Sequence, residues 1–212
     1  MYRKLVWMPV LAFCALATAM AGLAGGPWAL PALPVAALYS RLTGWLPANA
    51  AGDLRVAVTF FLTGLVPMLA GLGLTWFAAF HPGRRPPVGL AVLKYVAVLA
   101  VAAQLVIHIY YRAAGVATAA HALAQQIVKP LPVLLILGGL PHALIESIAI
   151  SFILSAPLYW LFRGVRVASL QRATFEAWIE IRRLIWPAVG LLLVATALQV
   201  WASPALSAAL LR

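Results

Sequence analysis

The sequence predicts an all-α fold, a polytopic membrane helical bundle of about five transmembrane helices with short re-entrant or interfacial helices. Of the 212 residues, 65% are hydrophobic and only 9% are charged, whereas roughly 25% of the residues in a soluble domain are charged. The apolar residues form long unbroken runs, which indicate helices and not the alternating strands of a membrane barrel. Because the polar remainder leaves only short loops, we expect a single integral membrane domain over residues 1–212.

Five apolar runs are the candidate spans. They cover residues 5–23, 56–80, 89–111, 131–162 and 184–201. The proline-rich stretch 26–39 is expected to lie at the interface or to begin a re-entrant piece, and residues 41–55 are expected to form a loop. Arg3 and Lys4 before an apolar stretch also resemble a signal peptide, but the apolar character continues beyond the Ala-x-Ala sites, which favours a retained span.

The distribution of Lys and Arg predicts the orientation, because positive residues gather in cytoplasmic connections. If the five runs alternate across the bilayer, nine of these residues lie on the side of the N-terminus and five on the other. The nine are Arg3, Lys4, Arg84, Arg85, Arg163, Arg166, Arg172, Arg182 and Arg183, and the five are Arg41, Arg55, Arg112, Lys129 and Arg212. We therefore expect a multi-pass protein of the cell membrane with a cytoplasmic N-terminus, an extracytoplasmic C-terminus and no nucleic-acid partner.

The third run carries a secondary polar stripe of Lys94, Gln104 and His108, continued by Tyr111. Lys94 lies near the cytoplasmic end, where its stem can extend the ammonium group to the headgroups. Gln104 and His108 are four residues apart and share a helix face, which should point towards other helices. Packing and hydrogen bonding explain this stripe more readily than a ligand site does.

The fourth run is predicted to break at Gly138 and Gly139. As one helix, residues 131–162 would measure about 48 Å, against a hydrocarbon core of about 30 Å. Two glycines favour a helix end, and Pro141 favours the first position of a new helix. Residues 131–137 are therefore expected to form a short re-entrant or interfacial piece, with the spanning helix starting at Pro141.

Pro141, His142, Glu146 and Gln199 form the candidate functional cluster. His142 and Glu146 are four residues apart near the start of the new helix, so they share a face and can interact. The pair could be a proton-coupled site, a cation site or a polar clamp between helices, and the clamp is favoured because intramembrane polar groups need partners in any case. Gln199 is expected to hydrogen-bond to Glu146 or His142 if the fourth and fifth helices pack antiparallel. The serines that follow at four-residue intervals, Ser147, Ser151 and Ser155, predict a buried face.

No catalytic or metal-binding set can be assembled from these residues. The segment offers one histidine where a zinc-protease helix needs two, and no Ser-His-Asp or Cys-His arrangement is evident. Haem ligation by His108 and His142 is a disfavoured alternative. We therefore expect no metal, no cofactor and no enzymatic activity.

Two connecting segments are predicted to be amphipathic helices. Residues 166–183 alternate basic, acidic and apolar residues, which is typical of a cytoplasmic interfacial helix that binds anionic lipid headgroups. Residues 112–129 are expected to form a short extracytoplasmic helix.

The C-terminal 80 residues, approximately, resemble the stage II sporulation protein M family of small polytopic membrane proteins. The family has a Pro-His-Gly-x-x-Glu motif opening a late membrane helix, which stands here as Pro141-His142-Ala143-Leu144-Ile145-Glu146 with Ala143 in place of the glycine. Members also end with a small-residue helix that runs into Glu and then Thr-Pro or Ser-Pro. Here Gln199 replaces that Glu, and Ser203-Pro204 follows. An Asn-Asn pair found in some members is missing, because Asn49 is the only asparagine.

The resemblance implies a membrane scaffold or assembly protein that remodels septal peptidoglycan together with cell-wall hydrolases. The alternative is a small-solute or ion transporter or channel subunit that uses His142 and Glu146 at the broken helix. An intramembrane enzyme ranks third, and a subunit whose polar residues only hold helices together also remains open.

Overall fold

The protein is described by a computed structural model over residues 2–23, 52–80, 87–163, 167–202 and 205. The regular structure of these residues is entirely helical, which confirms the all-α prediction. The predictions for residues 26–39 and 41–51 and for the C-terminal residues beyond 205 lie outside the described part. The predicted loop over residues 41–55 is wrong at its end, because residues 52–55 already belong to the helix Gly52–Ala79.

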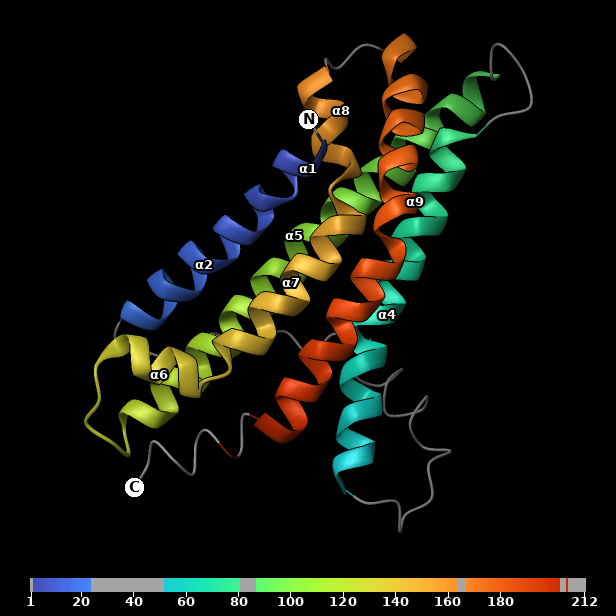
Figure 1. The fold of residues 1–212 in the computed structure, drawn as a ribbon. Coiled ribbons are helices and arrows are strands. Elements are labelled where there is room, and N and C mark those ends of the chain that lie inside the picture. The colour runs from blue at the N-terminus through green and yellow to red at the C-terminus, as the bar shows by residue number, and fades with distance from the viewer. Residues whose placement is uncertain (1, 24–51, 81–86, 164–166, 203–204, 206–212) are drawn as a thin grey trace.

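The helices run alternately between the two ends of an elongated bundle (Figure 1). The long elements are α2 (Trp7–Gly22), α4 (Gly52–Ala79), α5 (Val88–Ala124), α7 (Leu140–Leu154) and α9 (Val167–Ala197). Short helices complete them: α1 (Tyr2–Leu5), α6 (Leu131–Leu137), α8 (Ala156–Arg163) and a π-helix, η1 (Leu198–Ala202). The helices α1 and α8 and the start of α9 lie at one end, and α6, η1 and the start of α4 lie at the other.

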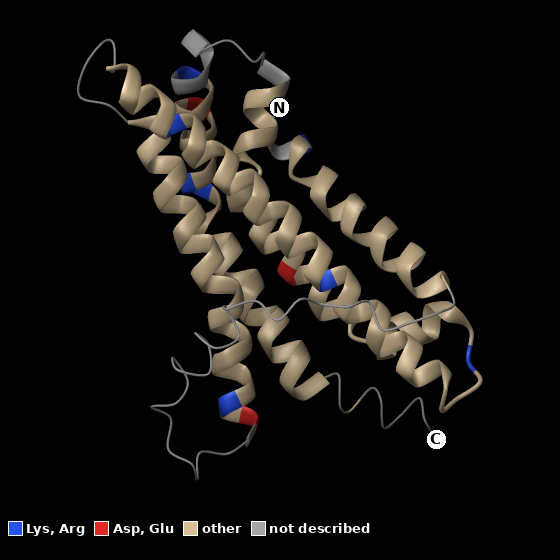
Figure 2. Cartoon of the chain, turned by 180° about the vertical axis from the view of Figure 1, so that it is seen from behind, with Lys and Arg blue, Asp and Glu red and all other residues tan. Residues whose placement is uncertain are grey.

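Among the described residues, three helices are long and apolar enough to cross a bilayer: Asp53–Ala79, Val88–Ala124 and Arg172–Ala202. The pair α6 and α7 adds a fourth if it forms one bent span. Helix α2 has 16 residues, about 24 Å at 1.5 Å per residue, which is shorter than the hydrocarbon core of about 30 Å. These lengths are compatible with a multi-pass membrane protein of three or four spans, while the count of five stays a prediction. Lys and Arg lie mostly towards the two ends of the bundle (Figure 2), and which end faces the cytoplasm also stays a prediction.

The prediction of a separate helix over residues 112–129 is wrong. Helix α5 continues through Arg112 to Ala124 and has 37 residues, about 55 Å at the usual rise. Arg112 ends the apolar run, but one polar residue does not interrupt a helix. The following residues are rich in alanine, the strongest helix former, and the only glycine among them, Gly115, costs too little to end the helix.

The prediction of a separate interfacial helix over residues 166–183 is also wrong. The described part of this segment belongs to α9, which continues without a break into the last apolar run and passes through Pro187. The amphipathic half of α9 packs against its neighbours. The Tyr159 hydroxyl of α8 donates to Glu176 Oε2 at 2.8 Å. Phe80, the residue directly after α4, packs edge-to-face on Phe175 and Trp178.

At the same end of the bundle, α1 is fixed by a buried tyrosine. The Tyr2 hydroxyl donates to the Phe152 carbonyl of α7 at 2.8 Å. Burial, and secondarily the negative charge of Glu180, raise the pKa of Tyr2 well above its usual value. The hydroxyl therefore stays protonated and keeps its donor at physiological pH.

Glycines of α4 allow the other helices to approach closely. A Cβ atom at Gly64 would lie 2.4 Å from Leu192 Cδ1 of α9, and one at Gly71 would lie 2.1 Å from Leu154 Cδ2 of α7. The missing side chains thus make room for leucines of two neighbouring helices. The apolar core divides into two clusters: the first joins α1, α4, α7, α8 and α9 with the start of α5, and the second joins α2 and α6 with the end of α5 and the start of α7.

Candidate functional site

The predicted break in the fourth run is confirmed at Gly138 and Gly139. Helices α6 and α7 meet there at 67°. Gly139 has a φ of 96°, a left-handed conformation that L-residues adopt at a cost. A Cβ at Gly138 would lie 2.9 Å from the Val116 carbonyl oxygen and 3.0 Å from the Ala120 nitrogen, so the turn packs against the backbone of α5. Helix α7 begins at Leu140, one residue before the predicted start, with Pro141 in its first turn.

The same run breaks a second time, which the sequence analysis did not anticipate. Helix α7 ends at Leu154, and α8 begins at Ala156. Ser147 and Ser151 are 1% exposed and Ser155 is 0% exposed, which confirms the predicted buried serine face. The expected helix from Pro141 to residue 162 is therefore two helices.

Glu146 is completely buried and forms an ion pair with Arg112. Its exposed fraction is 0%, and its Oε1 accepts a hydrogen bond from Arg112 Nη2 on α5, whose side chain is 23% exposed. Glu146 lies six residues after the start of α7, near the middle of that helix. An ionised carboxylate in such a place is costly unless it is paired. Arg112 supplies the compensating charge.

The ion pair lies where the two apolar clusters meet. On α5, buried residues belong to the first cluster up to Leu105 and to the second from Ala113 onward. On α7 the order is reversed, with Ala143 in the second cluster and Ala149 in the first. The pair therefore forms a polar layer between two apolar ones.

His142 and Phe60 extend this polar layer to a third helix. The His142 ring meets the Phe60 ring of α4 edge-to-face, with 5.6 Å between ring centroids. The guanidinium carbon of Arg112 lies 5.0 Å from the centroid of the same Phe60 ring, within the range of a cation–π interaction. Side chains of α4, α5 and α7 thus converge on one cluster, which we call the Arg-Glu cluster: Phe60, Arg112, His142 and Glu146.

The predicted hydrogen bond between Gln199 and Glu146 is wrong. Among the described residues, Gln199 Oε1 has no hydrogen-bond partner, and neither has Glu146 Oε2. Glu146 pairs with a guanidinium instead, because a full positive charge compensates a buried carboxylate better than an amide does. Gln199 lies on η1 and faces the first turns of α4.

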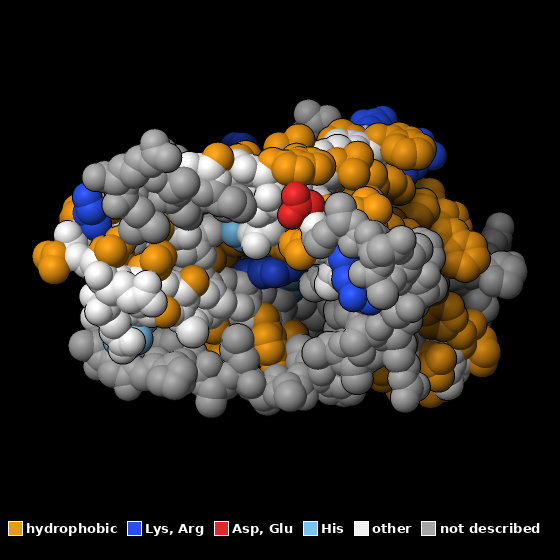
Figure 3. Space-filling model, turned by 90° about the horizontal axis from the view of Figure 1, so that it is seen from below, with side chains coloured by type: hydrophobic (Ala, Val, Ile, Leu, Met, Phe, Trp, Pro, Cys, Tyr) orange, Lys and Arg blue, Asp and Glu red, His pale blue; other side chains and the backbone are white. Residues whose placement is uncertain are grey.

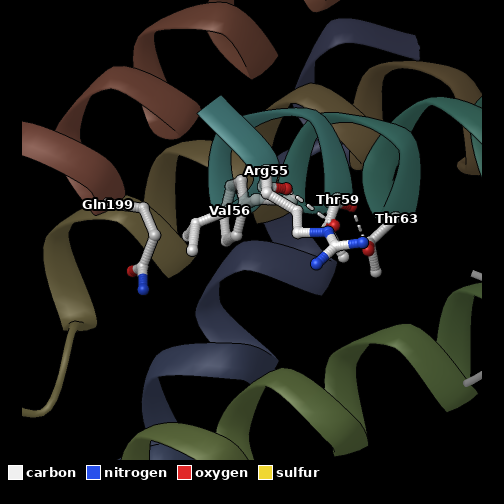
Figure 4. Close-up of a pocket in the computed structure, with 6 residues that line it drawn as sticks. Arg55, Val56, Thr59, Thr63 and Gln199 are labelled. Carbon is white, nitrogen blue, oxygen red and sulfur yellow. Dashed lines mark hydrogen bonds between the residues drawn. The ribbon is translucent and has the colours of Figure 1, made fainter. Parts of the chain in front are cut away.

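Gln199 lines a pocket of about 420 Å³ at the end of the bundle where α4 begins. The other lining residues all belong to α4: Arg55, Val56, Thr59, Phe60 and Thr63 (Figure 4). Seen from this end, the molecule is hollowed, and basic and histidine side chains gather around the hollow (Figure 3). Phe60 lines the pocket and also belongs to the Arg-Glu cluster, so its ring lies between the two.

The secondary stripe on α5 points towards α4, as predicted for a polar helix face. Gln104 Nε2 donates to the Pro67 carbonyl at 3.1 Å. Lys94 is 3% exposed and donates to the Phe80 carbonyl, at the C-terminal end of α4, at 3.1 Å. The expected extension of Lys94 to the headgroups is therefore wrong, because a helix C-terminus offers unpaired carbonyls and a negative dipole end closer by. His108 Nε2 is buried without a hydrogen-bond partner in the described part of the chain.

Arg112 is the residue of the site that the sequence analysis missed. The sequence analysis places it at the start of a separate extracytoplasmic helix, because it follows the last apolar residue of the third run. Its spacing held the missing signal, since Gln104, His108 and Arg112 recur every four residues and so continue one helix face. Extending the stripe by one turn would have included it.

In the described ranges, no group of three or more His, Cys, Asp or Glu residues could hold a metal ion. The chain matches no family model, no curated protein and no solved structure.

Proposed function

We propose that this protein is a non-enzymatic membrane scaffold or assembly protein, similar in role to the stage II sporulation protein M family, that works with cell-wall hydrolases in septal peptidoglycan remodelling. The observation that carries the proposal is the use of the Pro-His-x-x-x-Glu segment. The Glu146 carboxylate forms an ion pair with Arg112, and the His142 imidazole packs against the Phe60 ring. Both contacts join helices of the bundle.

The cluster supports a scaffold because it fixes the relative position of three helices. Removing either charge of a buried pair leaves the other uncompensated, which costs about 3–5 kcal/mol. Such a pair admits few alternative packings of α5 on α7. A rigid bundle presents its lipid-facing side chains, such as Trp186 at 80% exposed and Trp201 at 62%, in a constant arrangement that a membrane partner can recognise.

Affinity purification tests the proposal. The tagged full-length chain is cross-linked in membranes of its own host, extracted in mild detergent and analysed by quantitative mass spectrometry, with an equally expressed, unrelated polytopic protein as the control. Enrichment of cell-wall hydrolases, or of membrane proteins that bind them, is the expected result. A preparation that holds no envelope protein above the control would reject the scaffold role.

A transporter or channel subunit is the second candidate, because the pocket and the Arg-Glu cluster share Phe60. An opening next to an intramembrane ion pair is the arrangement expected of a solute or proton path. Flux through proteoliposomes of the purified chain distinguishes the candidates. Flux that Glu146→Gln abolishes favours transport. Absence of flux, together with a Glu146→Gln variant that loses both stability and partner recovery, favours the scaffold.

A further inference from the structure

The pocket between α4 and η1 lies at one end of a helix that is longer than the hydrocarbon core is thick. Helix α4 has 28 residues, about 42 Å, which exceeds the hydrocarbon thickness of about 30 Å. Its first turn, which contains Arg55, therefore lies at headgroup depth when the rest of the helix spans the core. Thr59 and Thr63 follow one and two turns deeper, about 6 and 12 Å along the axis.

Arg55 provides a positive charge at the pocket, near Asp53 in the first turn of the same helix. Its side chain is exposed, and no carboxylate of the described residues forms an ion pair with it. Figure 4 shows the side chain extending along α4 towards Thr59 and Thr63 and so lining the pocket. A guanidinium in this position can donate two parallel hydrogen bonds to a phosphate group.

Two side-chain oxygen atoms of the pocket, on Thr59 and Gln199, can accept hydrogen bonds. The Thr59 hydroxyl donates to the Arg55 carbonyl at 2.8 Å, which leaves its oxygen as an acceptor. Gln199 Oε1 is buried and has no hydrogen-bond partner in the described structure. A buried acceptor without a donor is costly, so a ligand that brings an O–H or N–H group would relieve it. The other walls, Val56 and Phe60, are apolar.

We propose that this pocket binds one phospholipid whose headgroup carries its own hydrogen-bond donors, as a glycerol or an ethanolamine headgroup does. The phosphate lies on Arg55, the headgroup hydroxyl or ammonium donates to Gln199 Oε1 and Thr59, and the apolar part of the lipid lies against Val56 and Phe60. A choline headgroup fits poorly, because it has a phosphate but no N–H or O–H donor. A soluble phosphate lacks the apolar part that the walls and the depth of the pocket require.

Native mass spectrometry of the full-length chain in detergent tests the site. The protein is titrated with phosphatidylglycerol, phosphatidylethanolamine and phosphatidylcholine of identical acyl chains, and separately with glycerol 3-phosphate. One adduct of the glycerol or ethanolamine lipid is expected to survive at lipid concentrations where the choline lipid is lost. Arg55→Gln should weaken this adduct about tenfold or more, the effect of losing a charge-assisted hydrogen bond, and Gln199→Leu should reduce the preference over choline.

Lys129→Gln is the matched control, because Lys129 is an exposed cation at the same end of the bundle that does not line the pocket. It should leave the adduct unchanged. Three results would overturn the proposal: equal retention of the choline lipid, equal weakening by Lys129→Gln and Arg55→Gln, or saturation by glycerol 3-phosphate that displaces the lipid. The scaffold proposal does not depend on this outcome, since partner recovery is measured separately.

Discussion

Replacing Arg112 should destabilise the protein more than any other single loss of charge in the described bundle. Arg112→Leu leaves the Glu146 carboxylate, 0% exposed, without its counter-charge. Unpairing a buried charge costs about 3–5 kcal/mol of unfolding free energy. Because no water reaches Glu146, we expect a value towards the upper end of this range.

The reverse change should cost less. Glu146→Leu leaves Arg112 without its ion-pair partner, but the Arg112 side chain is 23% exposed in the folded protein. Its guanidinium also keeps the Phe60 ring at 5.0 Å, a contact worth about 0.5–2 kcal/mol. We therefore expect Glu146→Leu to be milder than Arg112→Leu by about 1–2 kcal/mol, the size of that remaining contact. The double variant should recover most of the loss, because an apolar pair of similar volume often replaces a buried ion pair without net cost.

Reversible unfolding of the purified protein in mixed detergent micelles measures these differences. Arg172→Leu serves as the control. The Arg172 side chain, which pairs with Glu176, is 86% exposed, and such pairs on a helix surface contribute only about 0.3–0.5 kcal/mol to stability. If Arg112→Leu is no more destabilising than Arg172→Leu, or if the double variant is worse than either single variant, the ion pair does not hold the bundle as argued.

Three further substitutions test the contacts around the site by the same unfolding measurement. Gly138→Ala should lower the unfolding free energy by about 1–3 kcal/mol, because its Cβ would meet the rigid backbone of α5. Gly115→Ala is the control and should not destabilise, because nothing lies within 4 Å of its Cβ. Equal effects of the two substitutions would contradict the close approach at Gly138. Gly139→Ala should cost about 1–2 kcal/mol because of its φ of 96°, and an unchanged stability would argue against the left-handed turn. Gln104→Leu should lose about 0.5–1.5 kcal/mol with its hydrogen bond to Pro67; a more stable variant would refute that contact.

Local signals in the sequence were sufficient for several features of the candidate site. Glycine and proline act on their own backbone, so Gly138, Gly139 and Pro141 predicted the break and the restart of the helix to within one residue. The same reasoning missed the second break at Ser155, where no glycine marks the helix end. Predictions failed where a boundary of an apolar run was taken for a boundary of a helix. At Arg112 the run ends but α5 continues, and in α9 the helix begins well before the run does. Hydropathy reports preference for lipid, whereas a helix ends only where its backbone hydrogen bonds end.

The sequence by itself determined that the chain forms apolar helices long enough to span a membrane and that Glu146 would need a partner, because both follow from the cost of placing polar groups in hydrocarbon. Only the tertiary structure decided that the partner is Arg112 and not Gln199. The partner of Glu146 depends on the direction and depth of α5 relative to α7. Packing between residues that are far apart in the chain sets both. Composition and spacing within one helix do not indicate which side chain of a neighbouring helix lies at the same depth.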